Sequence, residues 1–207
     1  HSFPTRRSSD LVWETSPDNV TWSAAALPPT ASANTISIRN GHTVSMISAT
    51  VADDIVIENG GVLENNLPAS NAFTLENGTG DDMNINNGGI YLVLSGQNYS
   101  SHITINAGAT IRIQSGGMIQ IGDGGTVGGG NSAYASTSGT FIWEDASVFF
   151  WKTTIVPGIQ TTFFPDASIV IPVFRFGATP SLSMGGGSAT VINGRLEATS
   201  DISFTGN

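Results

Sequence analysis

The chain has no cysteine, a single lysine (Lys152) and few charged residues of either sign. The lack of cysteine excludes disulfides, zinc–thiolate sites and thiol nucleophiles. Charged residues make up only 11% of the 207 residues, whereas globular proteins average about 25%. The polar surface must therefore be built from Ser, Thr, Asn and Gly, which suit turns and the outward positions of strands.

Basic residues and long apolar runs are also scarce, which narrows the range of partners. The formal net charge is −9, and an acidic chain lacks the basic face that phosphate binding needs, so no nucleic-acid partner is expected. No run approaches the roughly 18 apolar residues of a membrane span, so no membrane insertion is expected. With 39% hydrophobic residues, the chain has enough apolar material for a packed core.

A short repeat runs through the first two thirds of the chain. Its template is apolar–x–apolar, two further residues and a glycine, as in Ile36–Gly41, Ile55–Gly60, Met83–Gly88 and Ile103–Gly108. The template glycines follow one another at intervals of 19, 28 and 20 residues. The longer interval predicts an outward loop, placed at Leu67–Asn71, because a repeat absorbs insertions at its corners.

Each part of the template has a physical meaning. Apolar residues at i and i+2 point to one face of a strand, and Asn-Gly or Gly-Gly supplies the positive φ of a sharp turn. Across the repeats, the outward positions are expected to carry Ser, Thr, Asn, Gln and isolated charges. The clearest group places Ile103, Ile105, Ile111, Ile113, Ile119 and Ile121 inward and Thr104, Arg112 and Gln120 outward.

Short strands joined by sharp turns at a nearly constant interval predict an all-β solenoid, wound as a parallel β-helix. The alternative is a β-sandwich of hairpins, since Asn40-Gly41 between two alternating strands is a strong local hairpin signal. No segment sustains the i, i+3, i+4, i+7 apolar spacing of a helix.

Composition divides the chain into five segments. We expect a non-native tail at 1–11, an N-terminal cap segment at 12–34, coils at 35–128, a Gly/Ser-rich loop at 129–139 and aromatic-rich further coils at 140–207. The sequence of His1–Leu11 resembles translated read-through of a sequencing adapter. Because a strand-like pattern stops abruptly at the last residues, both ends are interpreted as cuts in a longer gene.

The pattern after residue 13 resembles a known group of proteins. Trp13 and Trp22 precede a Pro-containing link, then the stretch Asn34–Met46 carries a Gly-His-Thr-Val turn, and Gly60-Gly-Val-Leu63 follows. This order is similar to the right-handed parallel β-helix (pectin-lyase-like) regions of large secreted Bacteroidetes-type surface proteins. The resemblance runs from about residue 13 to 125 and continues more weakly to 207.

The resemblance implies an exported bacterial protein, located outside the cell or on the cell surface. The repeats, the charge-poor surface and the lack of a catalytic constellation in the sequence predict a non-catalytic structural or adhesion module, such as a stalk or passenger segment, with extracellular glycans or other cell-surface components as partners. The same fold family contains polysaccharide lyases and hydrolases, so the alternative is a carbohydrate-binding or polysaccharide-degrading β-helix. Fold alone does not transfer function.

Paired carboxylates are the first candidates for chemistry. Asp53-Asp54, Asp81-Asp82 and Glu144-Asp145 are adjacent in sequence, and glycoside hydrolysis needs two carboxylates across one scissile bond. Adjacent residues in a strand face opposite sides, however, and an Asp before a strand commonly bonds nearby backbone. We therefore predict no catalytic residue and no cofactor; Asp81 and Asp82 are the weak candidates for a structural calcium site.

Aromatic residues crowd into the stretch from Phe141 to Phe176. Exposed aromatic rings stack on sugars, whereas large aromatic residues are usually buried. Three aromatic residues in succession at Phe149, Phe150 and Trp151 require at least one to face outward if they form a strand. Phe150 and Trp151 are the candidate carbohydrate-binding residues.

Overall fold

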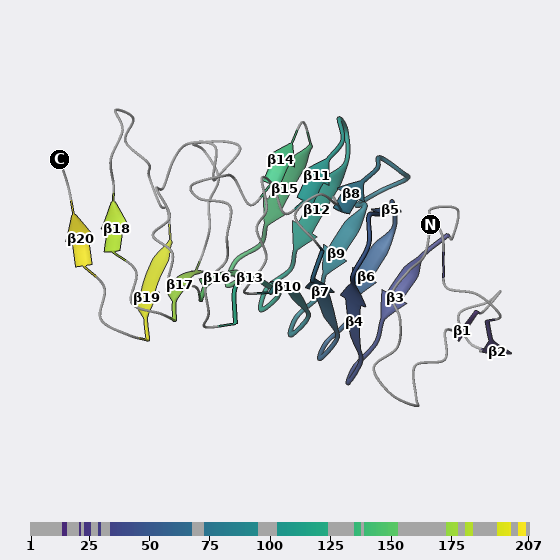
Figure 1. Cartoon of the computed structure of the whole chain (residues 1–207), viewed down its shortest axis with the longest axis horizontal. Coiled ribbons are helices and arrows are strands. Elements are labelled where there is room, and N and C mark those ends of the chain that lie inside the picture. Colours follow the sequence, from purple (N-terminus) through teal and green to yellow (C-terminus); the bar gives the residue numbers. More distant parts are fainter. Residues whose placement is uncertain are drawn as a thin grey trace.

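The fold is all-β across the part of the chain that the structure describes (Figure 1). The computed structural model describes residues 14–15, 21, 23–25, 29, 34–67, 73–94, 103–123, 135–137, 139–152, 173–177, 181–183, 194–199 and 203–205. These ranges contain strands and no helix, as the sequence predicted. Within them, nothing helical has the length and hydropathy that crossing a membrane requires.

Three parallel sheets form the body of the molecule. Sheet I contains β3 (Ile36–Ile38), β6 (Ile55–Ile57), β9 (Met83–Ile85), β12 (Thr110–Ile113) and β15 (Thr140–Trp143). Sheet II contains β4 (Thr43–Met46), β7 (Val62–Asn65), β10 (Ile90–Val93), β13 (Met118–Ile121), β16 (Val148–Trp151), β17 (Val173–Phe176) and β19 (Arg195–Ala198). Sheet III contains β5 (Thr50–Ala52), β8 (Phe73–Leu75), β11 (Ile103–Ile105) and β14 (Ala135–Thr137).

Two small pairs lie outside these sheets. Near the N-terminus, β1 (Glu14–Thr15) pairs with β2 (Ser23–Ala24) in antiparallel fashion. Near the C-terminus, β18 (Ser181–Ser183) pairs with β20 (Ser203–Thr205) in parallel. The predicted tail at 1–11 lies outside the described residues. Most of the predicted loop at 129–139 does too, but its residues 135–137 form β14 and pair with β11 instead of remaining a loop.

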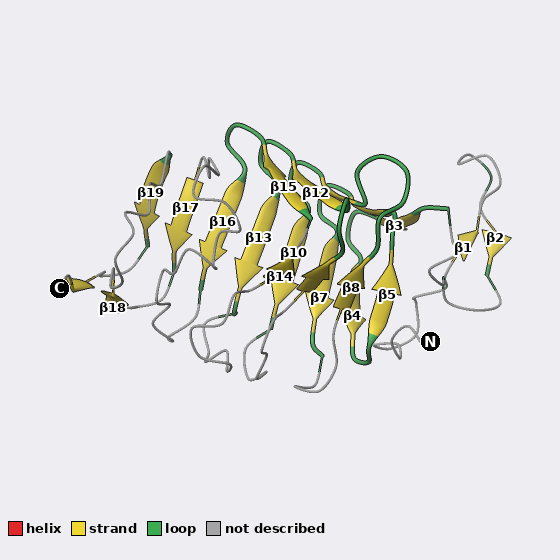
Figure 2. Ribbon diagram, turned by 90° about the horizontal axis from the view of Figure 1, so that it is seen from above, coloured by secondary structure: helices red, strands yellow, loops and turns green. Residues whose placement is uncertain are grey.

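From β3 to β16 the chain visits sheets I, II and III in strict rotation. Each strand therefore pairs with the strand one coil later and not with its neighbour in sequence, and all of these pairs are parallel. The hairpin alternative is wrong at its strongest point, because the Asn40-Gly41 turn connects β3 of sheet I to β4 of sheet II. Successive coils lie side by side along the long axis, as a β-helix-like fold requires (Figures 1 and 2).

The strand register corrects the predicted repeat interval. Ile36, Ile55, Met83, Ile111 and Phe141 occupy one column of sheet I, so successive coils are 19, 28, 28 and 30 residues long. The glycine that continues the column of Gly41, Gly60 and Gly88 is consequently Gly116 and not Gly108. Gly108 lies instead at the corner between sheets III and I, where a strand is also followed by a turn glycine.

The core is the space enclosed by the inward side chains of the three sheets. All six predicted inward isoleucines from Ile103 to Ile121 are 0–1% exposed, and burying each such side chain contributes about 1.5–3 kcal/mol. One buried polar residue, Asn65, donates from Nδ2 to the Tyr91 hydroxyl at 2.9 Å and accepts from the Leu67 N–H at 3.3 Å. Leu67 is itself fully buried, so the predicted outward loop does not begin there; residues 68–71 lie outside the described residues.

The corner between sheets I and II explains the glycine pairs. Gly60 has a φ of +75°, and its N–H donates to the carbonyl oxygen of Gly88 at 3.0 Å. The next residue, Gly61, lies so close to the preceding coil that a Cβ atom would be 2.3 Å from the Ile38 carbonyl oxygen. In the first coil the equivalent residue is His42, which is exposed, so a side chain fits at this position. This difference explains why the first turn reads Gly-His and the next three read Gly-Gly.

Ala146 takes the place of the turn glycine in the fifth coil. Its φ is +61°, and among the described residues it is the one non-glycine residue with positive φ. Its carbonyl oxygen accepts from the Gly116 N–H at 3.1 Å, so it continues the hydrogen-bonded column of the corner. A left-handed conformation costs an L-residue roughly 1–2 kcal/mol.

We predict that Ala146→Gly stabilises the protein by about 0.5–1 kcal/mol, because the relieved strain exceeds the added entropy of the unfolded chain. The free energy of unfolding in urea measures the effect. Ala198→Gly is the control: Ala198 is also exposed but lies within β19 and is not among the positive-φ residues, so this change should destabilise by about 0.5–1 kcal/mol. Equal effects of the two substitutions would contradict the strain at Ala146.

Candidate functional site

An acidic position recurs where the coils enter sheet I. Asp54 and Asp82 precede Ile55 and Met83, which are register partners. The Asp82 side chain is buried, with the residue 1% exposed. Its Oδ2 accepts from the Thr110 N–H at 2.7 Å and its Oδ1 accepts from the Gly78 N–H. Asp82 therefore holds the backbone of two coils together.

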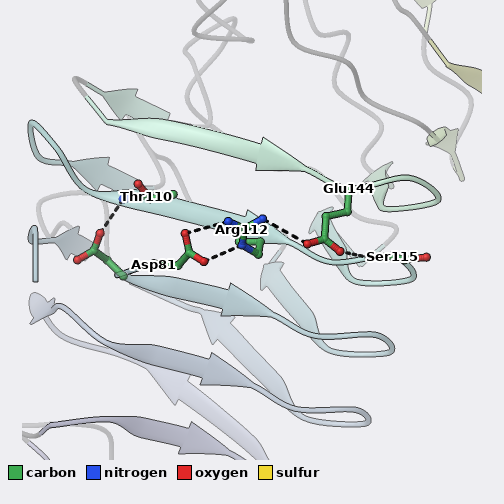
Figure 3. Close-up of polar contacts among 6 residues, drawn as sticks. Asp81, Thr110, Arg112, Ser115 and Glu144 are labelled. Atoms are coloured by element: carbon green, nitrogen blue, oxygen red, sulfur yellow. Dashed lines mark hydrogen bonds and ion pairs between the residues drawn. The ribbon is translucent and has the colours of Figure 1, made fainter. Parts of the chain in front are cut away.

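The neighbouring Asp81 points outward and joins an ion-pair row on the outer face of sheet I (Figure 3). Arg112 on β12 donates from Nε to Asp81 Oδ2 at 2.6 Å and from Nη1 to Glu144 Oε1 at 3.3 Å. The hydrogen bond that Arg112 donates to Asp81, and after it the one donated to Glu144, raises the pKa of Arg112 above its ordinary value. The row connects three successive coils, and Glu144 also accepts from the Ser115 N–H at 3.3 Å.

These contacts define what the acidic residues can do. Asp81 and Asp82 were the candidate calcium ligands, but one carboxylate is held by a guanidinium and the other by two backbone N–H groups. Both sets of donors compete with a cation for the same oxygens. In the described ranges, no three acidic or histidine side chains gather closely enough to hold a metal ion. The contacts of Asp81 and Asp82 therefore connect neighbouring coils.

The aromatic segment lies mainly inside the last coils. Trp151, one of the two candidate sugar-binding residues, is 5% exposed, so its ring has no free face for a ligand. It packs beside Phe149, whose ring centroid is 5.1 Å from that of Phe174 on the next strand of sheet II. Phe163 and Phe164 of the same segment lie outside the described residues.

Phe150, the other candidate, points outward from β16, which confirms that one of the three successive aromatic residues faces away from the core. Its ring is half-buried and lies beneath two cations: Lys152 Nζ is 5.9 Å and Arg175 Cζ is 5.6 Å from the ring centroid. Arg175 also donates to Glu197 Oε2 at 2.7 Å. That hydrogen bond is the main reason why the pKa of Glu197 lies below its ordinary value.

The outer face of sheet II differs from the sequence prediction. Its outward positions include half-buried Val62, Ile90, Leu92 and Met118, not only the polar residues and isolated charges that were expected. The unbroken apolar run of Ile90–Val93 could have indicated these outward apolar residues. A strand that is apolar at every position must be apolar on both faces.

Substitution of the two adjacent aspartates separates their roles. Asp82→Asn should destabilise by about 1–3 kcal/mol, because the amide nitrogen cannot accept from a backbone N–H and leaves a buried donor unpaired. Asp81→Asn, at a side chain that is 25% exposed, should cost about 0–1 kcal/mol, as for other surface ion pairs. Urea unfolding measures both, and a larger loss for Asp81→Asn would contradict the assignment.

Comparison with known proteins adds no family to this description. No protein-family model matches the chain, and neither the curated proteins nor the solved structures contain a significantly similar one.

Proposed function

We propose that this chain is a non-catalytic stalk or passenger module of a secreted or cell-surface bacterial protein, wound as a right-handed parallel β-helix. The observation that carries the proposal is that the best-defined polar contacts run between neighbouring coils. Asp82 bonds the backbone of the next coil, and Arg112 connects three coils. Among the described residues, side chains used in this way connect the coils of a rod.

Right-handed winding is supported by a general rule. Parallel strands of one sheet that are connected through a crossover follow a right-handed path in nearly all known cases, because of the intrinsic strand twist. The three sheets repeat this connection in every coil from β3 to β14. A solenoid of this kind is nearly one-dimensional, since each coil contacts mainly its neighbours.

A stalk should tolerate the loss of one whole coil. Deletion of residues 55–82 removes β6, β7 and β8 and joins Asp54 directly to Met83. Asp53-Asp54 then takes the place of Asp81-Asp82 before β9, so the register is kept. We expect a folded protein that is shorter by about 4.8 Å, the spacing of one strand, as measured by small-angle X-ray scattering and circular dichroism.

The matched control deletes residues 62–75, which removes β7 and β8 but keeps β6. Two strands of sheet I then follow each other without passing through sheets II and III, so cooperative unfolding should be lost.

The intact chain is also tested for depolymerisation of polysaccharides. Turnover that disappears in Asp81→Asn or Asp82→Asn would overturn the non-catalytic proposal.

The second candidate function, carbohydrate binding, is favoured by one observation: Phe150 presents an aromatic ring on an outer face. The two cations over that ring occupy positions that a stacked sugar would need. If the stalk proposal holds, a glycan array gives no ligand that depends on this ring. A glycan retained by the intact chain and by Leu92→Ala, a control in the same outer column, but lost in Phe150→Ala, would favour the second function.

A further inference from the structure

The outer face of sheet II presents two columns of side chains. The first residues of its five middle strands form an apolar column of Val62, Ile90, Met118, Val148 and Val173. The third residues of the same strands are Glu64, Leu92, Gln120, Phe150 and Arg175. In the second column a carboxylate lies at one end, a guanidinium at the other, and the bulky apolar residues flank the centre.

Each column is complementary to the same column of a second copy of the chain that faces it. The middle strand of the seven is β13, and a two-fold axis along this strand, between two facing copies, reverses the order of coils in the partner copy. Met118 and Gln120 then meet their own equivalents, and Leu92 lies opposite Phe150 and the two cations over its ring, Lys152 and Arg175. On the two outermost of the five strands, β7 and β17, Glu64 faces Arg175. The opposite charges meet, and the residues of the apolar first column meet one another.

We propose that this face pairs with the same face of a second copy of the chain, forming a two-fold symmetric dimer across sheet II. The proposal is independent of the stalk function. The alternative axis, along the direction in which the coils stack, would place Val62 opposite Glu64 and Val173 opposite Arg175. That arrangement buries charges against apolar side chains, which is costly, so the axis along β13 is the one the side chains favour.

The size of the face sets the expected strength. Five strands about 4.8 Å apart and about 13 Å long form a small contact, and Val148 and Val173 are already only 7% and 5% exposed in the single chain. Interfaces of this size belong to weak associations. The dimer should therefore appear at high micromolar concentrations and dissociate on dilution.

Sedimentation velocity over a range of concentrations tests the proposal. The average mass of the intact chain should rise toward that of a dimer. Glu64→Lys and Arg175→Glu should each weaken association by about tenfold or more, because each places like charges opposite each other. An equimolar mixture of these two variants should associate again, because the introduced lysine of one chain then faces the introduced glutamate of the other.

The mixture distinguishes pairing between copies from damage within one chain. Arg175→Glu also removes the contacts of Arg175 with Glu197 and Phe150, and mixing could not repair such a defect. Met118→Glu, at the axis, is a second variant that should abolish association, whereas Val56→Glu, on the outer face of sheet I, should leave it unchanged. A mass that stays monomeric at all concentrations, or a dimer indifferent to Met118→Glu, overturns the proposal.

Discussion

The backbone hydrogen bonds between coils are the constraint on which the rest of this structure depends. Each strand pairs with the strand one coil away, and the turn between sheets I and II continues the same ladder through Gly41, Gly60, Gly88 and Gly116. A coil must therefore return to the same register after every circuit, whatever its length. The coils of 19, 28 and 30 residues meet this condition because the additional residues lie between strands.

Register also decides what the side chains can do. Residues in one column are held about 4.8 Å apart, so a group on one coil meets the equivalent group on the next. This placement stacks the aromatic residues of sheet II. The ion pairs of Arg112 run diagonally to this register: its register partners are Asn84 and Ile142, and its long side chain bonds Asp81 and Glu144 of the same two neighbouring coils. Among the described residues, Arg112 and Arg175 both form ion pairs with carboxylates of neighbouring coils.

Much of the fold could be predicted from local pattern. The alternation of Ile103, Ile105, Ile111 and Ile113 with polar residues identified the strands and their inward faces. The grouping of the turn glycines was wrong at Gly108, because two different corners share one local template and only the pairing of distant strands separates them. The predicted loop at 129–139 failed at β14 for the same reason: the short polar strand Ala135–Thr137 is defined by its partner β11.

For the candidate site, too, some features follow from the sequence and others from the tertiary structure. The sequence by itself determined the inward and outward alternation, the need for glycine at the turns, the lack of cysteine and the low content of charged residues, since these follow from backbone geometry and composition. Only the tertiary structure decided that Trp151 is buried while Phe150 faces outward, that Asp81 and Asp82 are held by different partners, and that the outward apolar residues at the start of the sheet II strands line up in one column. These outcomes depend on which residues of other coils lie alongside, and this is set by a register that spans about 19–30 residues of intervening chain.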